Sequence, residues 1–67
     1  YEGNAFAFTG HAEKDLLSIT AVHPMRESAV RSLLSRANED WTLVEKLLYE
    51  KRLVETQYEG QWFYMRH

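Results

Sequence analysis

The sequence predicts an α+β fold: one small domain with a short N-terminal strand, two amphipathic helices and a C-terminal β-hairpin. Apolar residues recur at helical spacing over residues 24–37 and 41–51, which indicates the two helices. Two strand-like runs, 53–58 and 61–66, flank the pair Glu59-Gly60, the length of a tight hairpin loop. A chain of 67 residues holds one modest core, because it buries only about 60% of its unfolded surface.

The composition excludes several classes of protein. Hydrophobic residues make up 45% and charged residues 27%, which is ordinary for a soluble globular domain. The absence of cysteine excludes disulfides, thiolate metal sites and iron-sulfur clusters within this chain. No apolar run approaches a membrane span and no signal peptide is visible, so we expect a cytoplasmic protein without membrane contact. The chain begins with Tyr1 and not with methionine, so we expect a piece of a longer protein.

Residues 1–14 are interpreted as a flexible or linker segment, which leaves residues 15–67 as the folded domain. The segment holds two of the three glycines and a weak apolar alternation. Phe6 and Phe8 share one side of an extended chain and would pack on a preceding domain or on the hairpin. His11, Glu13 and Asp15 would also share one side, but without rigid support we expect a solvated charged stretch and no metal site.

A strand is predicted at about residues 17–22, because Ile19, Thr20 and Val22 are β-branched. The only proline, Pro24, then suits the first turn of a helix and favours an extended His23. The junction of His23, Pro24, Met25 and Arg26 is therefore a rigid corner between strand and helix. His23 is the one histidine within predicted structure, but no acid, nucleophile or metal motif accompanies it, so we expect no catalytic residue.

The second helix, at about 41–51, has a capping box of Thr42 and Glu45, with Asp40 as a competing cap. No glycine follows it, so Lys51 or Arg52 should adopt the strained turn conformation. Its outward face carries a net charge of −1 from five residues, Thr42, Glu45, Lys46, Tyr49 and Glu50. Such a face, with Glu59 at the hairpin tip, repels phosphates and argues against reading DNA.

The hairpin register pairs Tyr58 with Gln61. The pairs Val54–Met65 and Thr56–Phe63 are predicted to face the core, and Glu55–Tyr64 and Gln57–Trp62 to face water. With the first strand added to its edge, this is a small winged-helix-like domain, whose missing third helix would be a single turn at 37–41. The candidate interaction surface is formed by exposed aromatic and basic side chains, Trp62, Tyr64, Tyr49, Arg52 and Arg66.

The stretches "DLLSITAVHPMRESAVRSLL" and "WTLVEKLLYEKRLVETQYEGQWFYMR" resemble the C-terminal extension of a family of prokaryotic radical-SAM iron-sulfur proteins. These are relatives of the enzymes that build the wyosine base of tRNA. "ITAVHPMRE" is the most specific part of the resemblance, which covers most of the chain. In that family a three-cysteine motif in a barrel domain holds the cluster, and this chain has no cysteine.

The resemblance implies a non-catalytic appended domain whose parent holds a 4Fe-4S cluster and S-adenosylmethionine, with no cofactor in this chain. We expect it to dock on the preceding catalytic barrel or on a protein partner. The alternative is a nucleic-acid-binding winged helix that contacts tRNA for the parent enzyme, with weak RNA contact through Arg52, Arg66 and the exposed aromatics. The charge of the chain, −2, disfavours this alternative.

Overall fold

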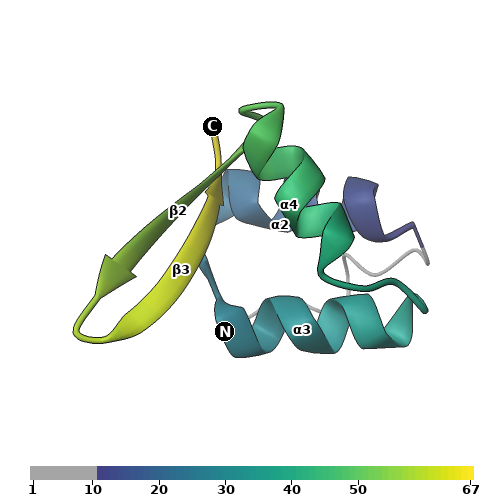
Figure 1. Cartoon of the computed structure of the whole chain (residues 1–67), viewed down its shortest axis with the longest axis horizontal. Helices are drawn as coiled ribbons and strands as arrows, with labels where there is room; N and C mark the ends of the chain where they lie inside the picture. Colours follow the sequence, from purple (N-terminus) through teal and green to yellow (C-terminus); the bar gives the residue numbers. More distant parts are fainter. Residues whose placement is uncertain (1–10) are drawn as a thin grey trace.

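A computed structural model describes residues 11–67, and these residues form three helices and a three-stranded antiparallel sheet (Figure 1). This arrangement confirms the predicted α+β class. The elements are, in chain order, α2 (Ala12–Val22), β1 (Met25–Arg26), α3 (Glu27–Arg36), α4 (Thr42–Tyr49), β2 (Leu53–Tyr58) and β3 (Gln61–Arg66).

The strand predicted at 17–22 is wrong, because this stretch is the second half of α2. Ala12, Leu16 and Ile19 are buried at spacings of four and three residues, which places them on one helical face. The Thr20 hydroxyl donates to the Leu16 carbonyl at 2.7 Å, a bond that a helix allows. The linker predicted at 1–14 therefore ends too late, since α2 begins at Ala12; the expectations for Phe6 and Phe8 lie outside the described residues.

The corner predicted at His23 to Arg26 exists, but it joins a helix to a strand. His23 ends α2 with φ −158° and ψ 158°, the extended conformation that a following proline favours. Met25 and Arg26 then form β1, so the helix predicted at 24–37 begins only at Glu27. The third strand of the sheet was thus predicted, but in the wrong residues.

The connection between α3 and α4 is a turn, so the helical turn predicted at 37–41 is wrong. Asn38 adopts φ 59°, and the Glu39 N–H donates to the Leu34 carbonyl at 2.8 Å, which ends α3 in a Schellman motif. Asp40 Oδ1 accepts the Thr42 N–H at 2.9 Å, so Asp40 supplies the cap of α4. Hydrogen bonds from Thr42 lower the pKa of Asp40.

The exit of α4 confirms the predicted strained turn and places it at Lys51. Lys51 has φ 61°, and its N–H donates to the Leu48 carbonyl at 3.1 Å. The Arg52 N–H donates to the Leu47 carbonyl at 2.9 Å and completes a second Schellman motif. A left-handed residue closes both α3 and α4, and neither is glycine.

The sheet has the order β1-β3-β2, so the last strand in the sequence is the central one. Every predicted pair of the hairpin is confirmed, from Val54–Met65 to Tyr58–Gln61 at the tip, and Leu53 also pairs with Arg66 at the base. Glu59 (φ 51°) and Gly60 (φ 80°) form the turn, both in the left-handed region that a two-residue type I′ loop needs. Met25 pairs with Tyr64 and Arg26 with Phe63 along the other edge of β3.

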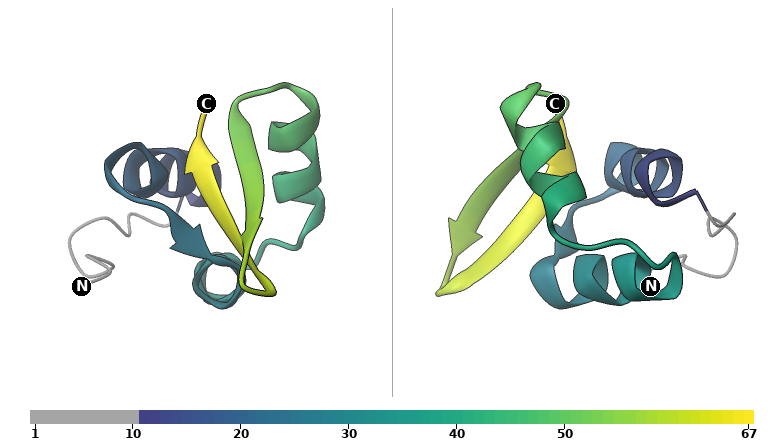
Figure 2. Two further views of the ribbon diagram at one scale, coloured as in Figure 1. Left: turned by 90° about the vertical axis from the view of Figure 1, so that its left-hand side faces the viewer. Right: turned by 45° about the vertical axis from the view of Figure 1, so that its right-hand side comes forward.

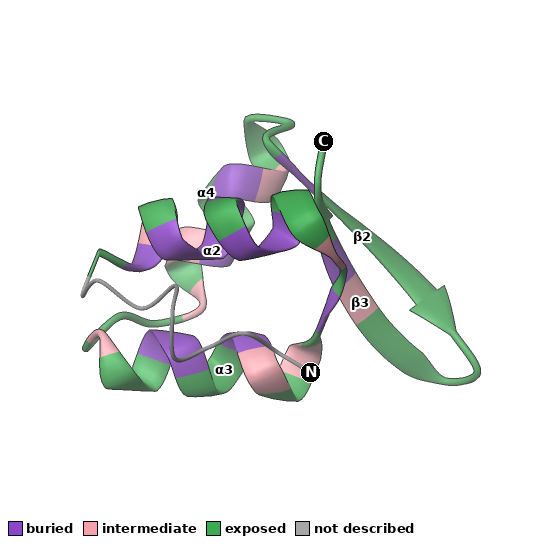
Figure 3. Ribbon diagram, turned by 180° about the vertical axis from the view of Figure 1, so that it is seen from behind, coloured by how far each residue is buried: buried purple, intermediate pink, exposed green. Residues whose placement is uncertain are grey.

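The core lies between the three helices and the base of the hairpin, and the hairpin stands out beyond them (Figures 2 and 3). Leu53 and Tyr64 are the only buried residues of the hairpin. The predicted core pair Val54 and Met65 is exposed, 38% and 39%, so the register was right and the face was wrong. The core is formed by twelve residues, Ala12, Leu16, Leu17, Ile19, Met25, Val30, Leu33, Leu34, Val44, Leu47, Leu53 and Tyr64.

Candidate functional site

Tyr64, predicted as part of an exposed surface, is 3% exposed and belongs to the core. Its ring packs against the Trp41 ring in a T-shaped arrangement, with a centroid distance of 5.5 Å and an interplanar angle of 78°. Burial, together with the carboxylates of Glu55 and Glu27, raises the pKa of the Tyr64 hydroxyl to about 12. Tyr64 is therefore a neutral packing residue at neutral pH.

The outer side of Trp41 is covered by Arg31, whose guanidinium carbon lies 4.3 Å from the ring centroid. Glu27 binds the same guanidinium through two contacts of 2.9 Å, from Nε and Nη2. Successive contacts thus link four side chains from α3 to the central strand of the sheet: Glu27, Arg31, Trp41 and Tyr64. This use of Arg31 makes it a structural residue.

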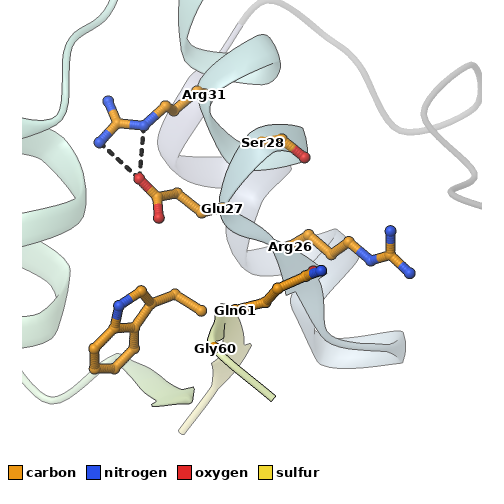
Figure 4. A pocket seen from close by; sticks show the side chains of 7 residues that line it. Arg26, Glu27, Ser28, Arg31, Gly60 and Gln61 are labelled. Atoms are coloured by element: carbon orange, nitrogen blue, oxygen red, sulfur yellow. Dashed lines mark hydrogen bonds and ion pairs between the residues drawn. The ribbon is translucent and has the colours of Figure 1, made fainter. Parts of the chain in front are cut away.

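Trp62 lines a shallow groove of about 490 Å³ between the start of α3 and the hairpin tip. The other lining residues are Arg26, Glu27, Ser28, Arg31, Gly60 and Gln61. Figure 4 shows Arg31 held by Glu27, while the Arg26 side chain points away from both. The two guanidinium groups therefore do not converge on one point in this groove.

The two strands of the hairpin present an exposed face without charged residues of their own, which we name the open face; Arg26 of β1, paired with Phe63, borders it on the same side of the sheet. The open face consists of the alternate residues of the two strands, Val54, Thr56, Tyr58, Gln61, Phe63 and Met65. Tyr58 is 65% exposed, and Phe63 is the one half-buried member. The charged residues of the two strands, Glu55 and Arg66, lie on the opposite face. Four apolar side chains on one accessible surface are typical of a protein contact.

Arg52 and Arg66 line a second groove of about 500 Å³, which we name the basic groove. Its other residues come from α2 and its N-cap: His11, Glu13, Lys14, Leu17 and Ser18. Arg52 Nη1 donates to Glu13 Oε2 at 2.7 Å, and Lys46 Nζ donates to Glu13 Oε1 at 3.4 Å. These cations lower the pKa of Glu13, with the Arg52 hydrogen bond as the largest cause.

Tyr49 is 88% exposed at the end of α4, as predicted. It lines neither groove and lies outside the open face. The predicted interaction surface is therefore divided: Trp62 lies at the hairpin tip, Arg52 and Arg66 in the basic groove, and Tyr49 on α4.

His23 is half-buried, and its Nδ1 lies 3.0 Å from the Pro24 carbonyl oxygen. This contact orients the ring on local backbone, and Met25 beside it is buried in the core. Within residues 11–67, no three His, Asp or Glu side chains gather as metal ligands. Of the trio weighed as a ligand set, Asp15 is buried on α2 while Glu13 binds Arg52 and Lys46.

Lys14 was not predicted as a site residue, because residues 1–14 are interpreted as a linker from the sequence, and Glu13 was considered only as a metal ligand. The spacing of His11, Lys14 and Ser18, which puts them on one stripe of a helix, is a signal that only a helical assignment reveals.

No helix of the described part of the chain has the length and apolar character needed to cross a membrane. No protein-family model and no solved structure matches the chain. The chain is similar to the UPF0026 protein MJ1312 of Methanocaldococcus jannaschii, with 40% identity over all 67 residues. The chain spans only 21% of the length of that relative.

Proposed function

We propose that this chain is a non-catalytic accessory domain of a larger protein and that it docks on another protein surface through the open face. The open face carries the proposal, because it exposes apolar residues of two strands, with Arg26 of β1 at its border as a neighbouring charge on that side of the sheet. The preferred occupant is the preceding catalytic domain of the same protein. The coverage of the relative supports this choice, since about four-fifths of that protein lies outside the matched segment.

The proposed architecture is a winged helix. The order helix, strand, helix, helix, strand, strand supports it, as does a sheet in which β3 lies between β1 and β2. In this interpretation the hairpin is the wing and α4 is the helix that would enter a DNA groove. Thr42, Glu45, Lys46, Tyr49 and Glu50 are all exposed, so the acidic face predicted for α4 is the face it presents. DNA reading by α4 is therefore not the function that we propose.

For the parent we propose a radical-SAM iron-sulfur protein, on the resemblance around "ITAVHPMRE". This chain contributes no cysteine, so the 4Fe-4S cluster and S-adenosylmethionine would be held elsewhere in the parent. Iron and sulfide analysis of the anaerobically purified longer protein tests this assignment. A parent without a cysteine-bound cluster would contradict it and would leave the docking proposal standing.

Docking is tested by binding between this chain and the separately produced remainder of the longer protein, measured by titration calorimetry. Met65→Glu and Val54→Glu place a charge on the open face, and each should weaken binding at least tenfold, since burying an unpaired carboxylate is costly. Both positions are exposed, so the melting temperature should change little. Tyr49→Glu is the matched control, because it adds a charge at an exposed aromatic outside the open face.

Equal losses in the Met65, Val54 and Tyr49 variants would refute the open face as the docking surface. Absence of binding by the unmodified chain, with the remainder folded, would refute docking altogether.

A further inference from the structure

We propose that the basic groove binds the phosphate groups of a nucleic-acid backbone without reading its bases. The groove is separate from the open face, so this inference does not depend on the proposed docking. Its side chains come from three distant parts of the sequence: α2 with its N-cap, the residue after the turn that ends α4, and the end of β3. The end of β3 lies close to α2 and to the start of β2 (Figures 1 and 2).

The fold concentrates positive charge here, although the chain as a whole is acidic. The groove is lined by three cations, Lys14, Arg52 and Arg66, and by one carboxylate, Glu13, which gives +2 with His11 neutral. The formal charge of the whole chain is −2. Within residues 11–67 the structure gives neither Lys14 nor Arg66 a carboxylate partner in an ion pair.

Glu13 is the internal competitor for any anion in this groove. It holds Arg52 at 2.7 Å and Lys46 at 3.4 Å, and its own side chain is 36% exposed. The Arg52 side chain remains 48% exposed, so it can turn part of its guanidinium fork towards a second anion. The groove therefore offers two cations at once, Lys14 and Arg66, and a third, Arg52, that Glu13 partly neutralises.

The shape of the groove favours a polyphosphate chain over a single phosphate or an acidic peptide. The groove is open and its cations are solvated, and an isolated exposed ion pair contributes only about 0–1 kcal/mol. An acidic peptide would need apolar anchors, but the one apolar lining residue, Leu17, is already 92% covered, at 8% exposure. A nucleic acid needs no anchor, because the release of its condensed counterions drives binding to surface cations.

The neighbouring acids define the path of the strand. Glu45 and Glu50 are exposed on and directly after α4, and Glu50 lies 3.7 Å from Arg52. A backbone is repelled from that side and would follow Lys14 and Ser18 along α2 towards Arg66. This path keeps the bases away from α4, so binding should not depend on base sequence.

The test is fluorescence anisotropy of the 67-residue chain with a labelled oligouridylate of about 12 nucleotides, between 20 and 200 mM salt. Contacts from Lys14, Arg52 and Arg66 predict a slope of log affinity against log salt of about −2, or about a 100-fold loss over this range. By the same relation, each contact raises the binding affinity about 15-fold at 20 mM salt. The affinity should therefore fall about 15-fold at 20 mM salt in Lys14→Gln and likewise in Arg66→Gln. In each variant the slope should become shallower by about 0.7.

Two variants separate this site from the rest of the surface. Arg26→Gln removes the same charge from the groove at Trp62 and should leave affinity within about twofold, apart from a general field effect. Glu13→Gln releases Arg52 and Lys46, so it should tighten binding and steepen the slope towards about −3. Far-ultraviolet circular dichroism of the variant checks that the gain in affinity comes from folded protein.

Four results would overturn the proposal. They are no saturable binding at 20 mM salt, equal loss from Arg26→Gln and Arg66→Gln, equal affinity for poly-glutamate of matched charge, and full displacement of the labelled oligouridylate by millimolar inorganic phosphate at constant ionic strength. The third result would favour an acidic protein partner and the fourth a small anion. None of these results bears on the calorimetric test of the open face.

Discussion

Lys51→Gly should stabilise this domain, although it replaces a helix-terminal lysine with the most flexible residue. Lys51 adopts φ 61° in the Schellman motif that ends α4. A side chain with a Cβ in this region costs about 1–2 kcal/mol, which glycine does not pay. Glycine also gains freedom in the unfolded chain, and this reduces the benefit by about 0.4–1 kcal/mol. The expected net gain is about 0.5–1 kcal/mol of unfolding free energy.

The assay is thermal and urea unfolding followed by circular dichroism. For a domain of this size 1 kcal/mol corresponds to about 4–8 °C, so the melting temperature should rise by about 2–8 °C. The chain supplies its own control at the other Schellman motif, because Asn38 has nearly the same φ, 59°. Asparagine tolerates the left-handed region, so Asn38→Gly should give clearly less than Lys51→Gly. An equal or larger gain at Asn38, or a loss at Lys51, would refute the reasoning.

Three further predictions follow from burial and titration. Leu47 has no exposed surface, so Leu47→Ala should lower the unfolding free energy measured in urea by about 2–5 kcal/mol. Val54→Ala, at an exposed position, should lower it much less. Similar losses would show that the hairpin packs more tightly than the fold indicates. The Tyr64 pKa is raised above its usual value of 10.0 to about 12, so its stabilisation is complete below pH 10 and is lost as the pH rises through about 12; ultraviolet titration should show a late phenolate step in this range that Tyr64→Phe removes. The Glu13 pKa is lowered, so its contribution is present above the unfolded value and is lost as the pH falls through the folded value; Glu13→Gln should make the melting temperature less sensitive to acid, and an unchanged acid limb would contradict the ion pairs.

The helices and the hairpin were predictable where local chemistry decides the conformation. Glu59-Gly60 accepts two positive φ angles, and that turn set the register of the hairpin. The lack of glycine after α4 was enough to place strain at Lys51 or Arg52. Asp40, weighed as the competing cap, holds the Thr42 N–H.

Residues 17–22 show where local preference fails. Ile19, Thr20 and Val22 are β-branched, but Ile19 and Thr20 are buried on the same face as Leu16, and this burial determines the helix. The prediction of which hairpin face is buried was wrong for a related reason. Alternation reveals that two faces differ, but not which one the helices cover, and here they cover only Leu53 and Tyr64 at the base.

The candidate sites were less predictable, because they are formed between elements far apart in the chain. Arg52 and Arg66 were chosen as exposed basic residues, and both line the basic groove. Arg52 and Arg66 share the groove with Lys14 because Lys14 lies on α2. The sequence analysis instead predicts a linker at residues 1–14 and a strand at 17–22. Tyr64 was predicted to lie on the water-facing side of the hairpin. That side is the one the core covers at Tyr64, so this residue is buried and does not belong to the interaction surface.

The position of β3 has a consequence for synthesis of the chain. Because β3 is central in the sheet and last among the elements, β1 and β2 have no strand to pair with until residues 61–66 have been made. On the ribosome the three helices can form early, but the sheet can close only after Arg66 has left the exit tunnel. A nascent chain stalled at Gly60 would present two unpaired strands, and a chaperone that recognises such edges should bind that intermediate and release the finished domain.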